Sequence, residues 1–115
     1  MYAAIEHRNH LSVLSHVPVT VSNAQITYNF TDQAGYSGGI SGQKEVAPGI
    51  WALYAGDGEK TVSNGDITGA DRTYFNTYNG NFDKYLPADY NLDGQVDGLD
   101  KIYWSNNNGI FKTVD

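Results

Sequence analysis

Cysteine is absent from all 115 residues of this chain, which excludes disulfide bonds and thiol chemistry. Its absence does not by itself fix the compartment in which the protein works. Proline occurs three times and glycine thirteen times, a balance that predicts many turns. No apolar run approaches the ~20 residues that a membrane-spanning helix needs, so we expect no membrane span. Met1 leads directly into strand-like sequence without a signal peptide, so we expect a mature or recombinantly expressed fragment.

Basic side chains are also scarce. Seven lysines and arginines stand against thirteen acidic residues, which gives a net charge of −6. Nine of the acids fall within residues 57–100, where there are only three bases. A nucleic-acid partner requires a basic face, so this balance argues against one and favours bound cations.

The acidic residues are most densely spaced in Asp89–Asp100, which reads D-Y-N-L-D-G-Q-V-D-G-L-D. Oxygen-bearing side chains stand at positions 1, 3, 5, 9 and 12 and a glycine at position 6, the spacing of a calcium loop that ends in Asp instead of Glu. Gly94 permits the sharp turn, and Val96 is expected to pack inward. The predicted ligands are the side chains of Asp89, Asn91, Asp93, Asp97 and Asp100 and the backbone carbonyl of Gln95. The alternative is a solvated acidic turn, in which four aspartates would repel one another without compensation.

The first 55 residues have the patterning of strands. Apolar residues alternate with polar ones in residues 11–21 and 25–30, and residues 2–6 also look like a strand. Pro48-Gly49 predicts a hairpin over residues 44–54, while the glycine- and serine-rich residues 32–42 predict a loop. We therefore expect a small antiparallel sheet in this part of the chain.

The second half contains an internal repeat at an offset of 29 residues. Each unit is predicted to be a loop followed by a helix, with Thr68 and Asp97 as N-caps and Gly80 and Gly109 as terminators. Aromatic and aliphatic side chains are expected to form the packed face of these helices: Tyr74, Phe75 and Tyr78 in one, Ile102, Tyr103 and Trp104 in the other. The seven identical pairs are Gly65/Gly94, Gly69/Gly98, Asp71/Asp100, Tyr74/Tyr103, Asn79/Asn108, Gly80/Gly109 and Phe82/Phe111.

Neither loop has a predicted helix before it, because Pro87 disfavours helix ahead of Asp89 and strand-like sequence precedes the first unit. A duplicated loop and exiting helix with Asp at position 12 resembles the type I dockerin family of secreted bacterial proteins, over residues 56–111. The resemblance implies a cohesin-like protein partner, bound through the helix faces. The exposed residues implied in that contact are Arg72, Asn76, Thr77, Lys101, Ser105 and Asn106.

The first unit departs from the family pattern. Aligned on Gly65 and Asp71, it has Lys60 and Val62 where ligands belong. Asp57 is the alternative first ligand if three extra residues bulge out. A second, weaker calcium site is then predicted from Asp57, Asn64, the Asp66 carbonyl, Thr68 and Asp71. The alternative is a degenerate loop held by packing alone.

The strand-rich half also resembles known proteins. The stretches H-R-N-H-L at residues 7–11 and G-I-W-A-L-Y-A-G-D at residues 49–57 resemble C-terminal regions of large secreted proteins from Bacteroidetes-type bacteria. This resemblance implies a secreted, extracellular or cell-surface location. A transition-metal site at His7 and His10 is not expected, because strand residues three apart point to opposite faces.

Together these features predict an α+β protein, with a strand-rich part over residues 1–55 and a dockerin-like part over 56–115, in one continuous domain. No nucleophile elbow, phosphate loop or catalytic triad pattern is present, so we expect no enzyme. The expected function is a non-catalytic extracellular module for protein assembly, anchoring or adhesion, with calcium as its ligand. Two alternatives remain open: a carbohydrate-binding module that stacks its many aromatics on sugar, or a filament or surface-layer subunit that associates with itself.

Overall fold

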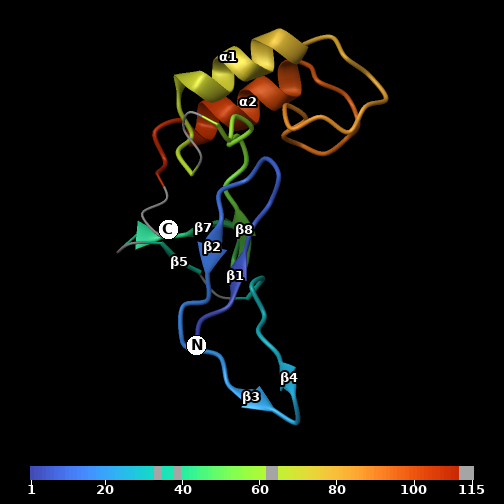
Figure 1. Cartoon of the computed structure of the whole chain (residues 1–115). Coiled ribbons are helices and arrows are strands. Elements are labelled where there is room, and N and C mark those ends of the chain that lie inside the picture. Colours follow the sequence, from blue (N-terminus) through green and yellow to red (C-terminus); the bar gives the residue numbers. More distant parts are fainter. Residues whose placement is uncertain (33–34, 38–39, 62–64, 112–115) are drawn as a thin grey trace.

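The structure is a computed structural model that describes residues 1–115 apart from 33–34, 38–39, 62–64 and 112–115. Three small antiparallel sheets come first and two helices follow, which confirms the predicted α+β character (Figure 1). The expected single sheet is thus divided into three. The elements are β1 (Ala4–Ile5), β2 (Val13–Leu14), β3 (Val21–Ser22), β4 (Gln25–Ile26), β5 (Tyr36–Ser37), β6 (Ile40–Ser41), β7 (Gln43–Ala47), β8 (Ile50–Leu53), α1 (Gly69–Tyr78) and α2 (Gly98–Asn107).

The largest sheet has the strand order β1-β2-β5-β6. Strands β5 and β6 fall inside residues 32–42, so the prediction of a loop there was wrong for these four residues. Gly35, just before β5, lies so close to β2 that a Cβ atom on it would be 2.2 Å from Val13 Cγ2. Small residues allow this close approach, and they also remove the alternation by which a strand is recognised in sequence.

Two hairpins accompany this sheet. Strands β7 and β8 pair around Pro48-Gly49, as the sequence predicts. Strands β3 and β4 pair around Asn23 and Ala24, both of which have positive φ angles, of 50° and 59°. This second hairpin is exposed and lies at the end of the molecule opposite the helices, which contributes to overall extents of 47 × 29 × 27 Å (Figure 1).

Both helices begin as the sequence predicts. Thr68 and Asp97 are the N-caps, and each forms a reciprocal capping box with the aspartate three residues later, Asp71 or Asp100. Neither helix in the described part of the chain is long and apolar enough to cross a membrane.

The two units are joined by crossed hydrogen bonds. Ile67, in the first loop, donates to Ile110 O at 2.9 Å and accepts from Gly109 N at 2.8 Å, beyond the end of α2. Val96, in the second loop, donates to Asn81 O and accepts from Gly80 N, both at 2.8 Å, beyond the end of α1. The start of each helix therefore lies beside the end of the other, so α1 and α2 pack antiparallel (Figure 1).

The main core lies between these helices and the strand-rich half. Phe75 and Trp104 are buried as predicted, and Val96 points inward as predicted. Ile102 and Tyr103 are 54% and 46% exposed, so their predicted place in the packed face was wrong. The buried positions of α2 are Asp100, Trp104 and Asn107; residue 102 lies on the opposite side of the helix, and residue 103 lies at the edge of the buried stripe. The core residues are Leu11, Ala55, Ile67, Phe75, Ala88, Tyr90, Val96 and Trp104, so both halves of the chain contribute.

Candidate metal centre

The second loop begins at Asp89, whose side chain is 2% exposed. Its Oδ1 accepts a hydrogen bond from Asp93 N at 3.1 Å, and its Oδ2 accepts one from Gly94 N at 2.9 Å. Gly94 has a φ angle of +87°, which turns the chain sharply enough for its N–H to point back at Asp89. The carboxylate at position 1 is therefore held in a fixed place inside the loop.

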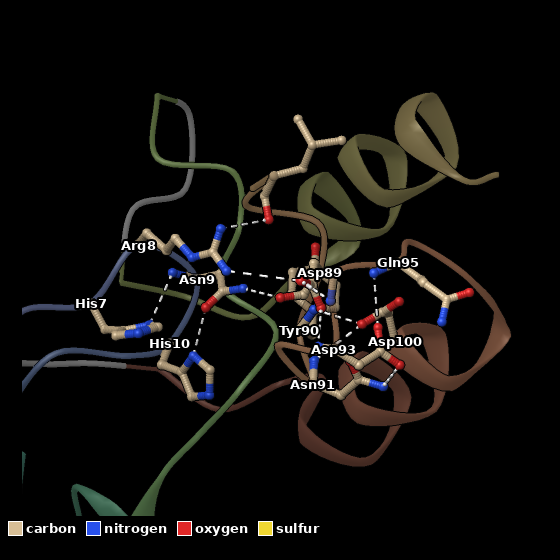
Figure 2. Close-up of polar contacts among 12 residues, drawn as sticks. His7, Arg8, Asn9, His10, Asp89, Tyr90, Asn91, Asp93, Gln95 and Asp100 are labelled. Atoms are coloured by element: carbon tan, nitrogen blue, oxygen red, sulfur yellow. Dashed lines mark hydrogen bonds and ion pairs between the residues drawn. The ribbon is translucent and has the colours of Figure 1, made fainter. Parts of the chain in front are cut away.

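Asn91 and Asp93 bring further oxygens to the same place (Figure 2). Asp93 N donates to Asn91 Oδ1 at 3.0 Å as well as to Asp89, so both oxygens converge on one amide. Asn91 Nδ2 donates to Asp93 Oδ2 at 3.0 Å, and Gln95 N donates to Asp93 Oδ1 at 2.9 Å. The loop thus gathers three of the predicted side-chain ligands into one cluster.

Asp100 closes the loop and is fully buried. Its Oδ1 accepts from Tyr90 N at 2.7 Å and from Asn91 N at 3.1 Å, while its Oδ2 accepts from Asp97 N at 2.8 Å. Burial raises the pKa of the Asp100 carboxyl above its ordinary value; these backbone N–H groups oppose the rise, and the nearby Asp89 carboxylate adds to it. The Asp97 side chain caps α2 by accepting from Leu99 N at 2.8 Å, and the Gln95 side chain is exposed.

The chemistry of this donor set fits a hard cation. Its donors are all oxygens, from carboxylates, an amide and a backbone carbonyl, which suits calcium and does not suit a soft metal. In the described part of the chain no three His, Cys, Asp or Glu side chains are gathered as metal ligands. The loop carboxylates are directed at backbone N–H groups, and a carboxylate has further lone pairs with which to bind a cation.

The first loop repeats the same hydrogen bonds. Asp57 Oδ2 accepts from Gly65 N at 3.2 Å, over eight residues, where Asp89 Oδ2 accepts from Gly94 N over five. Asp57 therefore occupies position 1 despite the three-residue insertion. The two turn glycines, Gly65 and Gly94, have φ angles of 90° and 87°.

Asp71 closes the first loop as Asp100 closes the second. It accepts from Glu59 N at 2.9 Å and from Thr68 N at 2.8 Å, and burial raises the pKa of its carboxyl. Asp66 pairs with Phe111 as Gln95 pairs with Phe82. Glu59 and Thr61 lie two and four positions after Asp57, as Asn91 and Asp93 do after Asp89, and they make the matching hydrogen bonds.

The first loop differs at its cation position. Lys60 Nζ lies 2.5 Å from Asp57 Oδ2 and 3.4 Å from the carbonyl oxygen of His10. The predicted ligand Asn64 lies outside the described residues. A second calcium site formed by Asp57, Asn64, Asp66, Thr68 and Asp71 therefore stays a prediction.

The H-R-N-H stretch joins both loops to the strand-rich half. The Asn9 carbonyl oxygen accepts from Gly56 N at 3.0 Å and from Asp57 N at 3.1 Å. The Asn9 side-chain amide donates to the Asp89 carbonyl (Figure 2). Arg8 donates to Leu86 O at 3.1 Å and lies 3.9 Å from Asp89 Oδ2. Sequence reasoning missed these roles, because nothing in a local pattern indicates a partner about 80 residues away.

The two histidines of this stretch do not lie on opposite faces. Their rings meet edge to face, with centroids 4.5 Å apart, because residues 7–9 bend instead of forming a strand. The reason given for excluding a shared site was therefore wrong. In the described part of the chain no third ligand joins His7 and His10. Burial, followed by the charge of nearby bases and of His7, lowers the pKa of His10 to about 4.

The residues implied in partner contact are exposed on the helices. Arg72 and Lys101 occupy the same place in the two units, as do Asn76 and Ser105, and Thr77 and Asn106. The Arg72 guanidinium carbon lies 5.7 Å from the centroid of the Trp104 ring, so one of the two cations rests against the other helix. The duplicated fold thus presents matched polar positions on both helices.

Comparison with models of known protein families, with curated protein sequences and with solved structures finds no match to this chain.

Proposed function

We propose that this chain is an extracellular, calcium-stabilised, non-catalytic module for protein assembly, anchoring or adhesion, with a dockerin-like pair of loop–helix units. The observation that carries the proposal is the second loop. There, Asp89 and Asp100 are buried, and the half-buried Asn91 and the exposed Asp93 bring further oxygens to them within the same twelve residues. Buried carboxylates are retained in folded proteins when they are paired or bind a metal.

Calcium would act in this loop as a folding ligand. No helix leads directly into Asp89, because residues 81–88, all of them described, contain a β-bridge at Phe82, a bend and a turn. Millimolar calcium outside a cell matches the ~10⁻⁴–10⁻³ M dissociation constants of extracellular modules. The full ligand set of the second loop would make this site tighter than that range, and calcium at about 100 times the dissociation constant would add about 2.7 kcal/mol to the free energy of unfolding. This is a large share of the 5–15 kcal/mol, roughly, that stabilises a domain.

The test is the substitution Asp93→Asn, which removes one exposed carboxylate from the cluster without disturbing the core. We expect the melting temperature of this variant to fall below that of the wild type in calcium and to equal it in chelator. Asp83→Asn is the matched control, because Asp83 is an exposed aspartate outside the loop. Equal losses in calcium and in chelator would falsify the calcium assignment.

The assembly role rests on the paired helix surfaces. Arg72 with Asn76 and Lys101 with Ser105 give two similar polar strips, which suits a cohesin-like partner or a second copy of the chain. Sedimentation velocity in calcium at rising protein concentration distinguishes these partners. A monomer at every concentration excludes self-association and leaves a different protein as the partner.

A groove between the β7–β8 hairpin and α2 favours carbohydrate as a second candidate ligand. It has a volume of about 250 Å³, and Tyr103, Asn91 and Asn106 are among its lining residues. An aromatic ring beside amide groups is a common arrangement for binding a sugar. A glycan array probed with the whole chain tests this candidate, and an array without any bound glycan excludes it.

A further inference from the structure

The equivalence of the two loops makes Lys60 directly comparable with Leu92. The backbone N–H of the preceding residue, Glu59 or Asn91, donates to the closing aspartate in each loop, at 2.9 Å and 3.1 Å. Leu92 points its side chain outward and is exposed, whereas Lys60 folds back to the carboxylate of position 1. The same place in the loop thus carries an apolar side chain in one unit and a cation in the other.

Asp57 and Lys60 form a short, charge-assisted contact. The Asp57 side chain is fully buried, the Lys60 side chain is 30% exposed, and the N···O distance is 2.5 Å. The His10 carbonyl oxygen, 3.4 Å away, is a second oxygen partner for the ammonium. In the second loop the nearest base is Arg8, at 3.9 Å from Asp89 Oδ2, and its guanidinium rests on the Tyr85 ring. Only the first loop therefore has an ammonium in direct contact with its position-1 carboxylate, among the described residues.

We propose that the Lys60 ammonium is the cation of the first loop, so that this loop closes without a metal ion and the chain binds one calcium ion instead of two. A divalent cation bound at Asp57 would lie within a few ångströms of the ammonium and would be repelled by it. The first loop also has hydroxyls, on Thr61 and Thr68, where the second has the carboxylates of Asp93 and Asp97. Because Glu59 stands where the second loop has Asn91, the first loop has one carboxylate fewer at its side-chain ligand positions and one internal cation more.

The stoichiometry in this inference rests on the calcium site proposed for the second loop, whereas the role of Lys60 does not. Two measurements on the full chain separate these parts. Calorimetric titration with calcium counts the ions bound by the wild type and by Asp93→Asn. Thermal melting in chelator compares Lys60→Met with Lys60→Arg and with Lys44→Met, in which an exposed lysine loses the same charge.

We expect the wild type to bind one calcium ion and Asp93→Asn to bind none with comparable affinity. In chelator, Lys60→Met is expected to melt about 5 °C or more below the wild type, because it leaves a buried carboxylate without its cation. Lys60→Arg should recover most of that loss, and Lys44→Met should melt with the wild type.

Two results overturn the inference. One is a second calcium equivalent in the wild type that survives in Asp93→Asn, since a metal would then bind the first loop despite Lys60. The other is a melting temperature of Lys60→Met that equals that of Lys44→Met in chelator. If neither the wild type nor Asp93→Asn binds calcium, the proposed function fails. The comparison of melting temperatures in chelator then still decides the role of Lys60.

Discussion

Lys60 carries a positive charge, whereas Leu92, at the same place in the second loop, carries none. We propose that this charge decides whether a loop binds calcium or is neutralised by its own lysine. The carboxylates of Asp57 and Asp89 are held by equivalent hydrogen bonds from Gly65 and Gly94. What differs is the nearest cation. In the first loop it is Lys60, a residue of the loop itself, at 2.5 Å from the carboxylate; in the second it is Arg8, at 3.9 Å. With a lysine beside the position-1 carboxylate in the first loop and none in the second, the two loops would differ in their ion chemistry.

His10 is predicted to make stability depend on pH. Its pKa falls from 6.5 to about 4 in the folded chain, mainly because it is buried. Between these values the unfolded chain binds more protons than the folded chain, so the free energy of unfolding is expected to decrease as the pH falls from 6.5 to 4.

Urea unfolding at several pH values measures this slope. His10→Gln should make the slope shallower, while His16→Gln, which replaces an exposed histidine, should leave it as it is in the wild type. The same slope in all three proteins would show that His10 is not the group responsible.

The individual side chains of the second loop were predictable, and those of the junction were not. Asp89, Asn91, Asp93 and Asp100 lie together because their spacing in sequence sets their spacing in the loop. Beside its bonds to His7 and His10, Asn9 contacts three residues that are 47 or more positions away, and the sequence near it carries no sign of these. A periodic sequence pattern indicates hydrogen bonds between residues that are close in the chain. Contacts that form when distant segments pack together leave no such pattern in the sequence.

At the scale of elements, hydrogen bonds hold the ends of the two helices, while Phe75 and Trp104 pack them into the core. Each helix of ten residues is too short to be stable alone in water. A capping box fixes the first turn of each helix. The crossed hydrogen bonds of Ile67 and Val96 hold the segments before and after the helices. The caps were evident from the sequence, whereas β5 and β6 were not, because strands of two residues among glycines and serines are too short to show an alternation.

The two caps are predicted to respond differently to calcium. Thr68→Ala removes the oxygen that accepts from Ala70 N and should cost about 1 kcal/mol of unfolding free energy, in calcium and in chelator alike. Asp97→Ala removes the equivalent oxygen and also a proposed calcium ligand, so it should cost a similar amount in chelator and more in calcium.

Urea denaturation with and without calcium measures both costs. An Asp97→Ala cost that calcium does not change would show that Asp97 serves only as a helix cap. A Thr68→Ala cost that rises in calcium would show instead that the first loop binds the ion.

At the scale of the whole molecule, the crossed hydrogen bonds join each loop to the end of the other unit's helix. Loss of calcium from one loop should therefore weaken hydrogen bonds in the other unit. Gly80 N donates to Val96 O of the second loop, and Gly109 N donates to Ile67 O of the first. With calcium in the second loop and Lys60 in the first, chelation is expected to reduce the exchange protection of Gly80 more than that of Gly109.

Hydrogen exchange with and without chelator tests this difference within one sample. Ser15 N, which donates to Ala3 O at 2.7 Å beside the four-stranded sheet, is the internal reference, and its protection should be least affected. Equal protection of Gly80 in calcium and in chelator would show that the ion does not hold the helical units together.

The contact between Asn9 and Asp89 also has a consequence for the order of events in time. It joins residues 80 positions apart, so the junction closes a long loop whose entropic cost must be met before the contact forms. During synthesis the H-R-N-H stretch is made long before either of its partners. At about 5–20 residues per second, it waits for several seconds before Asp89 follows. The junction between the H-R-N-H stretch and the second loop can therefore close only after Asp89 has been made.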